Sequence, residues 1–301
     1  MNHFTLHHTT GRGLLLLLLL LLTPVTGKGQ DVQVGAVTFK ALKRDFAGTD
    51  MGYRKADISS GAAGGKALVI YLHGGSSCGT DNVTQMQEPG IDSIASYLHR
   101  QQIPAVMLVP QCSDRSRGWG GMAGNVKALL DFTVRTEGID TTRIYIFGGS
   151  MGGTGTWKML STYPRYFAAG MPCAANPKGM SAESVATTPV YNVMGLDDKI
   201  MNEQVRAIAQ DFITQLRALG DEAEYETVEG WTHETTCIQS YSAARLGWVF
   251  AHSRSQASGI GGTPACQEEP GAWHTLQGMR LERPASPGLY IHADRKVLVM
   301  P

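Results

Sequence analysis

The stretch Ile144-Tyr145-Ile146-Phe147-Gly148-Gly149-Ser150-Met151-Gly152-Gly153 decides the fold expected for this chain. An apolar run leads into a Gly-x-Ser-x-Gly pattern, and residues 154–163 behind it have helical character. A nucleophilic serine projects from a sharp strand-to-helix turn, whose crowded backbone requires glycine on either side. The dipole of the following helix favours negative charge near the serine oxygen. The pattern alone is weak, and an ordinary glycine-rich turn is the alternative interpretation.

Strand-like and helix-like segments alternate on both sides of this stretch. Apolar runs predict buried strands at residues 67–72, 105–109, 167–173 and 189–194, with a late strand at 224–228. Helical patterns cover 91–102, 124–136, 202–219 and 240–252, and a hairpin turning at Gly48-Thr49-Asp50 joins strands 33–44 and 51–58. This alternation predicts a doubly wound α/β fold, a mostly parallel sheet with helices on both faces.

The two ends of the chain differ from residues 28–254, which we interpret as the catalytic domain. Residues 1–27 combine Arg12, a leucine run and a small-residue end, which predicts a signal peptide. We therefore expect a protein that is secreted, periplasmic or on the cell surface, without a membrane span in the mature chain. Residues 255–272 are a Gly, Ser and Pro-rich linker, and residues 273–301 predict a short C-terminal β appendage with strands at 289–292 and 296–299.

Composition excludes some classes of partner. Lys+Arg and Asp+Glu each number 26 and no basic block appears, which argues against nucleic acid or an anionic membrane. The five cysteines have no zinc-ligand spacing, so no metal site is expected. Their odd number leaves at least one thiol unpaired within the chain. Cys78–Cys112 and Cys173–Cys237 are candidate disulfides, and no pattern indicates an oligomeric state.

A base for Ser150 is found by chain order. On this fold the order is serine, acid, histidine, and the base follows a late strand. Of the nine histidines, only His233 has that position. The others lie before the serine, in the closing helix or in the appendage: His3, His7, His8, His73, His99, His252, His274 and His292. We expect His233 in a loop after the last core strand; a surface histidine beside Trp231 is the alternative.

An acid to orient His233 is expected at the carboxyl end of the strand 189–194. Asp197 and Asp198 stand there, at the edge where open α/β sheets hold their sites. We favour Asp198 as the acid, with Asp197 capping the next helix, over the alternative that both only shape the turn. Asp211, inside a predicted helix, and Asp221, in a turn, are weaker candidates.

Backbone donors for an oxyanion are expected after the strand 67–72. His73-Gly74-Gly75-Ser76 follows it directly, and glycine lets the backbone approach a substrate oxygen closely. The predicted donors are the amides of Gly75 and Met151, with His73 in a structural role. Trp119 and Trp231 are candidates for stacking on a sugar or aromatic ring of the substrate, but packing in the core or at the rim of the site is the favoured interpretation for both.

Four motifs together resemble one known group. Tyr71–Gly75, Gly148–Gly153 with Gly155-Thr156-Trp157, Gly195-Leu196-Asp197-Asp198 and Gly230–His233 are similar to those of secreted esterases of the α/β-hydrolase fold. These esterases are related to polyhydroxybutyrate depolymerase and to feruloyl and acetylxylan esterases, and are often labelled predicted peptidases. The group's G-x-x-D pattern falls on Asp198. Where the group often has an aspartate, early in the helix before the nucleophile strand, this chain has Gly121-Met122-Ala123-Gly124-Asn125.

The resemblance implies serine hydrolysis of carboxylic esters without a cofactor. The expected partner is a small-molecule or polysaccharide ester, with acetyl or feruloyl esters on plant polysaccharides favoured. The tail, residues 273–279 with 288–291, is similar to short C-terminal elements of exported proteins from some Gram-negative anaerobes, which implies sorting or a stabilising edge. A peptidase or acyltransferase using the same residues stays open, as does a non-catalytic glycan-binding protein.

Overall fold

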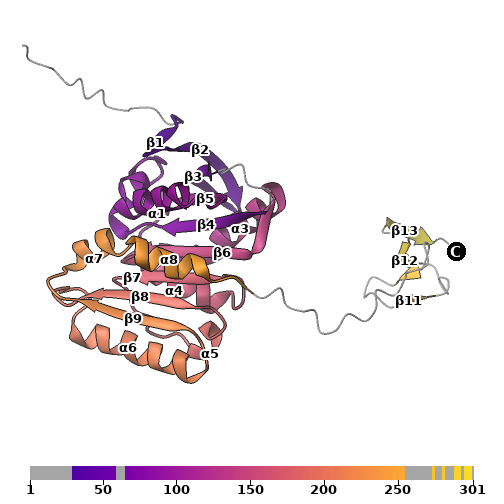
Figure 1. The fold of residues 1–301 in the computed structure, drawn as a ribbon. Coiled ribbons are helices and arrows are strands. Elements are labelled where there is room, and N and C mark those ends of the chain that lie inside the picture. The colour runs from indigo at the N-terminus through magenta and orange to yellow at the C-terminus, as the bar shows by residue number, and fades with distance from the viewer. Residues whose placement is uncertain are drawn as a thin grey trace, which may run out of the picture.

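The computed structural model describes residues 29–58 and 65–254, together with 273–274, 280–281, 288–292 and 295–299. Within these ranges the main domain is a sheet of nine strands in the order β1-β2-β3-β5-β4-β6-β7-β8-β9 (Figure 1). The strands are β1 (Val32–Val34), β2 (Val37–Phe46), β3 (Thr49–Ile58), β4 (Lys66–Leu72), β5 (Ala105–Pro110), β6 (Ile139–Gly149), β7 (Ala169–Cys173), β8 (Val190–Gly195) and β9 (Ala223–Val228). The predicted signal peptide and linker lie outside the described residues.

The sheet is antiparallel at one edge and parallel elsewhere. β1, β2, β3 and β5 pair antiparallel in that order, whereas every neighbour from β5 through β4 to β9 pairs parallel. β4 lies near the centre, and its residues 67–72 are fully buried, as the continuous apolar run predicts. The doubly wound α/β prediction is confirmed.

Helices cover both faces of the sheet. They are α1 (Pro89–Arg100), α2 (Gly118–Gly121), α3 (Ala123–Thr136), α4 (Met151–Thr162), α5 (Ala182–Val185), α6 (Glu203–Ala218), α7 (His233–Gln239) and α8 (Ala243–Ala251). Two short 3₁₀ helices, η1 (Gly75–Ser77) and η2 (Thr84–Gln87), follow β4. α1 begins at Pro89, whose missing N–H costs nothing at a helix start, and buries Ile91, Ile94 and Leu98 at helical spacing.

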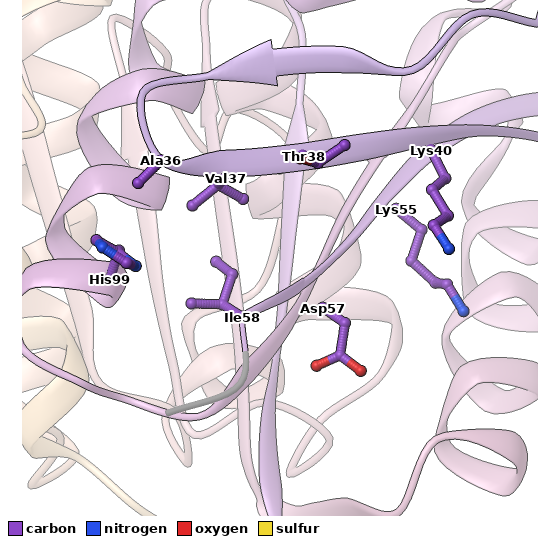
Figure 2. A pocket seen from close by; sticks show the side chains of 8 residues that line it. All are labelled: Ala36, Val37, Thr38, Lys40, Lys55, Asp57, Ile58 and His99. Atoms are coloured by element: carbon purple, nitrogen blue, oxygen red, sulfur yellow. The ribbon is translucent and has the colours of Figure 1, made fainter. Parts of the chain in front are cut away.

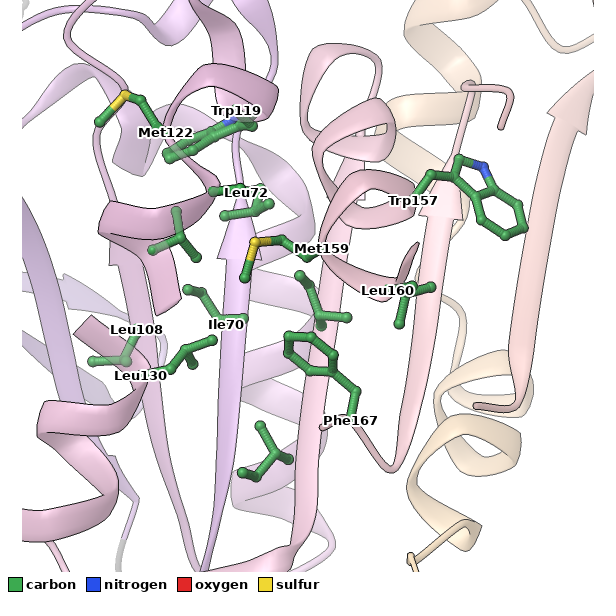
Figure 3. Close-up of a cluster of buried hydrophobic side chains, with 14 of the residues drawn as sticks. Ile70, Leu72, Leu108, Trp119, Met122, Leu130, Trp157, Met159, Leu160 and Phe167 are labelled. Atoms are coloured by element: carbon green, nitrogen blue, oxygen red, sulfur yellow. The ribbon is translucent and has the colours of Figure 1, made fainter. Parts of the chain in front are cut away.

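The core consists of two clusters, one on each face. Ile91 of α1 and Leu246 of α8 belong to one cluster, and residues of α3, α4 and α6 to the other. Figure 3 shows the second cluster, in which Ile70 and Leu72 of β4 lie beside Met159 of α4. α4 therefore packs against the central strand, directly behind the position of Ser150.

The opening hairpin and the closing helix differ from the sequence-based expectation, and the predicted strand 33–44 forms two strands, β1 and β2. The opening hairpin turns at Ala47 and Gly48, because Phe46 pairs with Thr49 and both turn residues have positive φ (53° and 78°). Positive φ at both central residues is the tight turn that matches strand twist, so Thr49 and Asp50 belong to the strand. The closing helix begins at Ala243, where the Ser242 side chain caps it, and α7 is a separate helix before it.

A second, four-stranded sheet is formed by β10 (Trp273–His274), β11 (Arg280–Leu281), β12 (Gly288–His292) and β13 (Arg295–Val299). The two predicted strands of the appendage lie in β12 and β13, which pair antiparallel with His292 opposite Arg295. This part of the chain therefore contains the strands that its alternating pattern predicts.

The loop after β4 is fixed by the buried side chain of His73. Its Nε2 accepts a hydrogen bond from the Cys112 backbone N–H at 2.9 Å, so Nδ1 carries the proton and donates to the Gly74 carbonyl at 2.7 Å. The Trp119 indole donates to the His73 carbonyl at 2.9 Å. The neutral imidazole thus ties the end of β4 to the end of β5.

The contact between α4 and β4 predicts that Gly152 tolerates no side chain. A Cβ there would lie 1.8 Å from the Leu72 carbonyl oxygen, whereas a Cβ at Gly124 in α3 would meet nothing within 4 Å. Gly152→Ala should lower the free energy of unfolding by about 3 kcal/mol or more. Gly124→Ala, the control, should raise it by about 0.5–1 kcal/mol. Urea denaturation followed by tryptophan fluorescence measures both, and equal stabilities would contradict the packing.

The buried His73 predicts a pH-dependent stability. Burial lowers its pKa below the ordinary value, so the folded protein keeps it neutral while the unfolded chain protonates it near pH 6.5. This contribution is complete above about pH 6.5 and is lost as pH falls from there toward the folded pKa, by at most about 1.4 kcal/mol per pH unit. His73→Gln keeps an acceptor for Cys112 and does not titrate. Between pH 7.5 and 5.5 the unfolding free energy should fall more steeply in wild type; parallel curves would refute this.

Candidate active site

Ser150 lies at the sharp turn between β6 and α4. It has φ 56° and ψ −121°, a strained conformation for a residue other than glycine, and its N–H donates to the Cys173 carbonyl at 3.0 Å. A Cβ at Gly148 would lie 2.4 Å from the Gly152 carbonyl oxygen. The flanking glycines are therefore required by crowding, and the turn holds the serine out from the sheet at the N-terminus of α4.

His233, which lies 83 positions after Ser150 in the chain, is hydrogen-bonded to it. Its Nε2 lies 2.8 Å from Ser150 Oγ, and its Nδ1 lies 2.7 Å from Asp198 Oδ2. The expectation of a loop position is wrong, because His233 is the first residue of α7, which Thr232 caps by accepting from the Thr235 N–H at 3.3 Å. The helix start fixes the backbone from which the imidazole projects.

The Asp198 carboxylate is buried and fully hydrogen-bonded. Its side chain is 2% exposed, and Oδ1 accepts from the N–H groups of Ile200 and Met201, each at 2.8 Å. One oxygen is therefore held by the backbone while the other meets His233. Such an arrangement holds the carboxylate in place and points it at the imidazole.

The neighbouring acid has a different place. Asp197 is exposed, and its N–H donates to the Trp231 carbonyl at 3.0 Å. The expectation that it caps the following helix is wrong: Asn202 caps α6 by accepting from the Val205 N–H at 3.1 Å. Of the two adjacent aspartates, only Asp198 contacts the imidazole.

A cavity of about 750 Å³ opens at Ser150 and His233, and the two predicted oxyanion donors line it. Met151 is the first residue of α4 and Gly75 the first of η1, so neither amide has a partner inside its own helix. Within the described residues neither donates to another loop or strand. Both N–H groups are therefore available to an oxygen of a molecule bound in the cavity.

The cavity wall combines apolar and charged side chains. Ile200 and Ile238 line it and are 62% and 37% exposed, which is unusual for large aliphatic residues. Arg115 and Glu88 also line it, on the side of η1. Sequence reasoning missed both; Glu88 stands directly before Pro89, a position that marks a helix start rather than a site. The wall offers an apolar surface opposite charged groups.

The two tryptophans lie in different surroundings. Trp119 is 1% exposed and packs edge-on against the His73 ring, so the expectation that it stacks on substrate is wrong. Trp231 is half-buried, lies under the Arg245 guanidinium at 5.2 Å, and is not among the residues that line the cavity. The indole of Trp119 therefore serves packing, the role that the sequence favours.

The predicted disulfides are absent from the described part of the chain. Cys78, Cys112, Cys173 and Cys237 are all free thiols, and Cys266 lies outside the described residues. Burial raises the pKa of Cys112 to about 11 and that of Cys173 to about 11, so these thiols stay protonated. Buried neutral thiols behave as small apolar side chains.

A second hollow, of about 500 Å³, lies between β2, β3 and α1 (Figure 2). Two of its charged side chains are already paired, Lys55 with Glu137 and Asp57 with Lys66. These charges stabilise neighbouring elements, so we assign no ligand to this hollow. In the part of the chain described here, no helix is long and apolar enough to cross a membrane.

The chain is similar in sequence to curated esterases over part of its length. No family model matches it. Among curated proteins it is 22% identical over 162 residues to the bifunctional acetylxylan esterase/xylanase XynS20E of Neocallimastix patriciarum, covering 54% of this chain and 24% of that protein. It is 26% identical over 135 residues to feruloyl esterase B of Neurospora crassa, covering 41% and 44%. The matched regions thus span less than half the length of these relatives.

Solved structures agree on the fold. A thermostable esterase superimposes with a TM-score of 0.62 at 26% identity, over 72% of this chain and 63% of that one. The S-formylglutathione hydrolase of Staphylococcus aureus gives 0.54 at 16% identity, over 74% and 100%. The resemblance to acetylxylan and feruloyl esterases expected from the four motifs is confirmed. The chain therefore has the α/β-hydrolase fold, and the curated proteins named above to which it is similar are acetylxylan and feruloyl esterases.

Proposed function

We propose that this protein is an exported serine esterase with Ser150, His233 and Asp198 as its catalytic triad. The observation that carries the proposal is the continuous hydrogen-bonded chain from Ser150 Oγ through His233 to Asp198 Oδ2, open to a cavity at the serine end. A serine hydroxyl becomes a nucleophile when a base accepts its proton and a third group orients that base. The distances from His233 to Ser150 Oγ and to Asp198 Oδ2 are hydrogen-bond distances, as these roles require.

The reaction proceeds in two halves. Ser150 Oγ attacks the ester carbonyl while His233 Nε2 accepts its proton, and the Asp198 carboxylate stabilises the resulting imidazolium. The amides of Gly75 and Met151 donate to the oxyanion of the tetrahedral intermediate. His233 then gives the proton to the leaving alcohol, and the acyl-enzyme remains. Water attacks the acyl-enzyme with the same base, which releases the acid and restores Ser150.

The proposed substrates are acyl esters, acetyl or feruloyl, on plant polysaccharides. The names of the similar proteins, acetylxylan esterase and feruloyl esterase, support this class. The cavity of about 750 Å³ is large enough for an aromatic acid, since binding sites for small molecules are commonly about 300–1,000 Å³. The exposed side chains of Ile200 and Ile238 supply an apolar surface for an aromatic ring.

Removing the nucleophile tests the proposal directly. Ser150→Ala should reduce kcat for hydrolysis of short-chain aryl esters by about six orders of magnitude, because the acyl-enzyme cannot form. Circular dichroism checks that the variant is folded. Equal rates for wild type and Ser150→Ala would refute the assignment of the nucleophile. Parallel assays on acetylated xylan, feruloylated arabinoxylan and a peptide amide, with and without an added alcohol acceptor, separate an esterase from a peptidase or an acyltransferase.

The two adjacent aspartates form a matched pair. Asp198→Asn should lower kcat by about three to four orders of magnitude, because an amide no longer holds the imidazole in the required tautomer. Asp197→Asn, which removes an exposed carboxylate one residue away, should leave kcat within about twofold. Steady-state kinetics on an aryl acetate measures both. A larger loss in Asp197→Asn would reverse the choice of acid.

A further inference from the structure

The Gly75 amide belongs to a short turn, residues 74–77, and Glu88 contacts both ends of this turn. Its Oε1 accepts from the Gly74 N–H at 3.1 Å and from the buried Ser77 hydroxyl at 2.6 Å. Gly74 directly precedes η1, and Ser77 is its last residue. One carboxylate oxygen therefore joins the two ends of the turn. Hydrogen bonds to a charged acceptor are about twice as strong as neutral ones, so this link is firm.

His73 holds the opposite side of Gly74. Its Nδ1–H donates to the Gly74 carbonyl, which belongs to the same planar peptide group as the Gly75 N–H. The N–H of Gly74 is held by Glu88 and its C=O by His73. Both dihedrals of Gly74, φ −71° and ψ 171°, are thereby restrained from two directions. This matters because a glycine has no Cβ to limit its conformation.

The direction of the Gly75 N–H depends on these restraints. Gly75 and its neighbour Ser76 line the cavity with Ser150, and no other hydrogen bond within the described residues fixes the N–H of Gly75. An oxyanion donor contributes fully only when it is aimed before the charge develops. Rotation about Gly74 would turn the donor away from the reacting carbon without unfolding the domain.

The Glu88 carboxylate is stabilised by its hydrogen-bond donors and by its position at a helix start. Two donors meet one of its oxygens, and Glu88 is the N-cap residue of the twelve-residue helix α1, where the helix dipole favours an anion. These donors and the helix dipole therefore stabilise the carboxylate in its position beside the turn. Its role is distinct from that of Asp198, which contacts His233.

We propose that Glu88 is a positioning residue that aims the Gly75 amide at the oxyanion, an inference that rests on the proposed esterase function. Glu88 acts through the Gly74–Ser77 turn and not on the substrate. Losing its acceptor should weaken binding of the transition state more than binding of the ester.

The test compares Glu88→Ala, Glu88→Gln and Glu88→Asp with the control Asp92→Asn. Asp92 is in the first turn of the same helix and is bonded to Ser96, so the control removes a charge without touching the turn. Glu88→Ala should lower kcat on an aryl acetate by about 10- to 100-fold with KM changed less than about threefold. Glu88→Gln, which retains an oxygen acceptor, should recover most of kcat, and Asp92→Asn should match wild type.

A trifluoromethyl ketone gives the decisive second readout, because its adduct with a serine places an oxyanion where the ester oxygen would be. Its inhibition constant should rise in Glu88→Ala by the same factor as kcat/KM falls, a correspondence that general destabilisation would not produce. If Glu88→Ala does not fold, the shorter Glu88→Asp should show the same parallel loss. Unchanged kcat and inhibitor binding in folded Glu88 variants would overturn the inference.

The failure of this inference can be distinguished from failure of the proposed function. If Ser150→Ala is inactive and Glu88→Ala is as active as wild type, the triad stands and the role of Glu88 is wrong. If wild type has no esterase activity, hydrogen exchange still decides whether Glu88 restrains the turn: peptides covering residues 74–77 should exchange faster in Glu88→Ala than in Asp92→Asn. Equal exchange would overturn the inference without reference to activity.

Discussion

The close approach of α4 to the end of β4 is the constraint on which the site depends. A Cβ at Gly152 would lie 1.8 Å from the Leu72 carbonyl oxygen and 2.9 Å from that of His73. The backbone of the serine turn therefore rests on the backbone that leads into the glycine loop. This contact brings Ser150 next to Gly75, although 75 positions separate them in the chain. Glycine at 152 is required for the distance and not for flexibility.

Hydrogen-bonded polar groups, of which His73 and Asp198 are buried, hold the rest of the site in place around that contact. Asp198 is held by the backbone of residues 200 and 201, His73 is held by Cys112 and Gly74, and Glu88 is hydrogen-bonded to the Gly74–Ser77 turn that it restrains. Each of these groups is positioned by the backbone of a neighbouring loop, where a fully satisfied network is rigid. The groups that face the cavity, Ser150 Oγ and the amides of Gly75 and Met151, are left for a bound molecule.

Much of the fold and the site could be predicted because the signals are local or ordered along the chain. The apolar run at 67–72 predicts the central strand, and serine, acid and histidine occur in the order that this fold allows. Prediction failed where a residue's surroundings come from distant segments. Trp119 gives no sequence signal that it is buried under His73, and His233 gives none that it begins a helix. The prediction of two disulfides was wrong because a disulfide needs a specific geometry of both side chains, which nearness of two segments does not provide.

The sequence by itself determined the α/β class, the serine turn and the order of the candidate catalytic residues. Hydrophobic periodicity and the order of residues can both be read along the chain without knowing which segments come into contact. Only the tertiary structure decided which of two adjacent aspartates meets His233, since neighbouring side chains at the end of a strand point in different directions. It also decided that Glu88 reaches the Gly74–Ser77 turn, because a loop and a helix start meet there through folding alone. The direction of a side chain and its contacts with distant residues are set only when the chain folds.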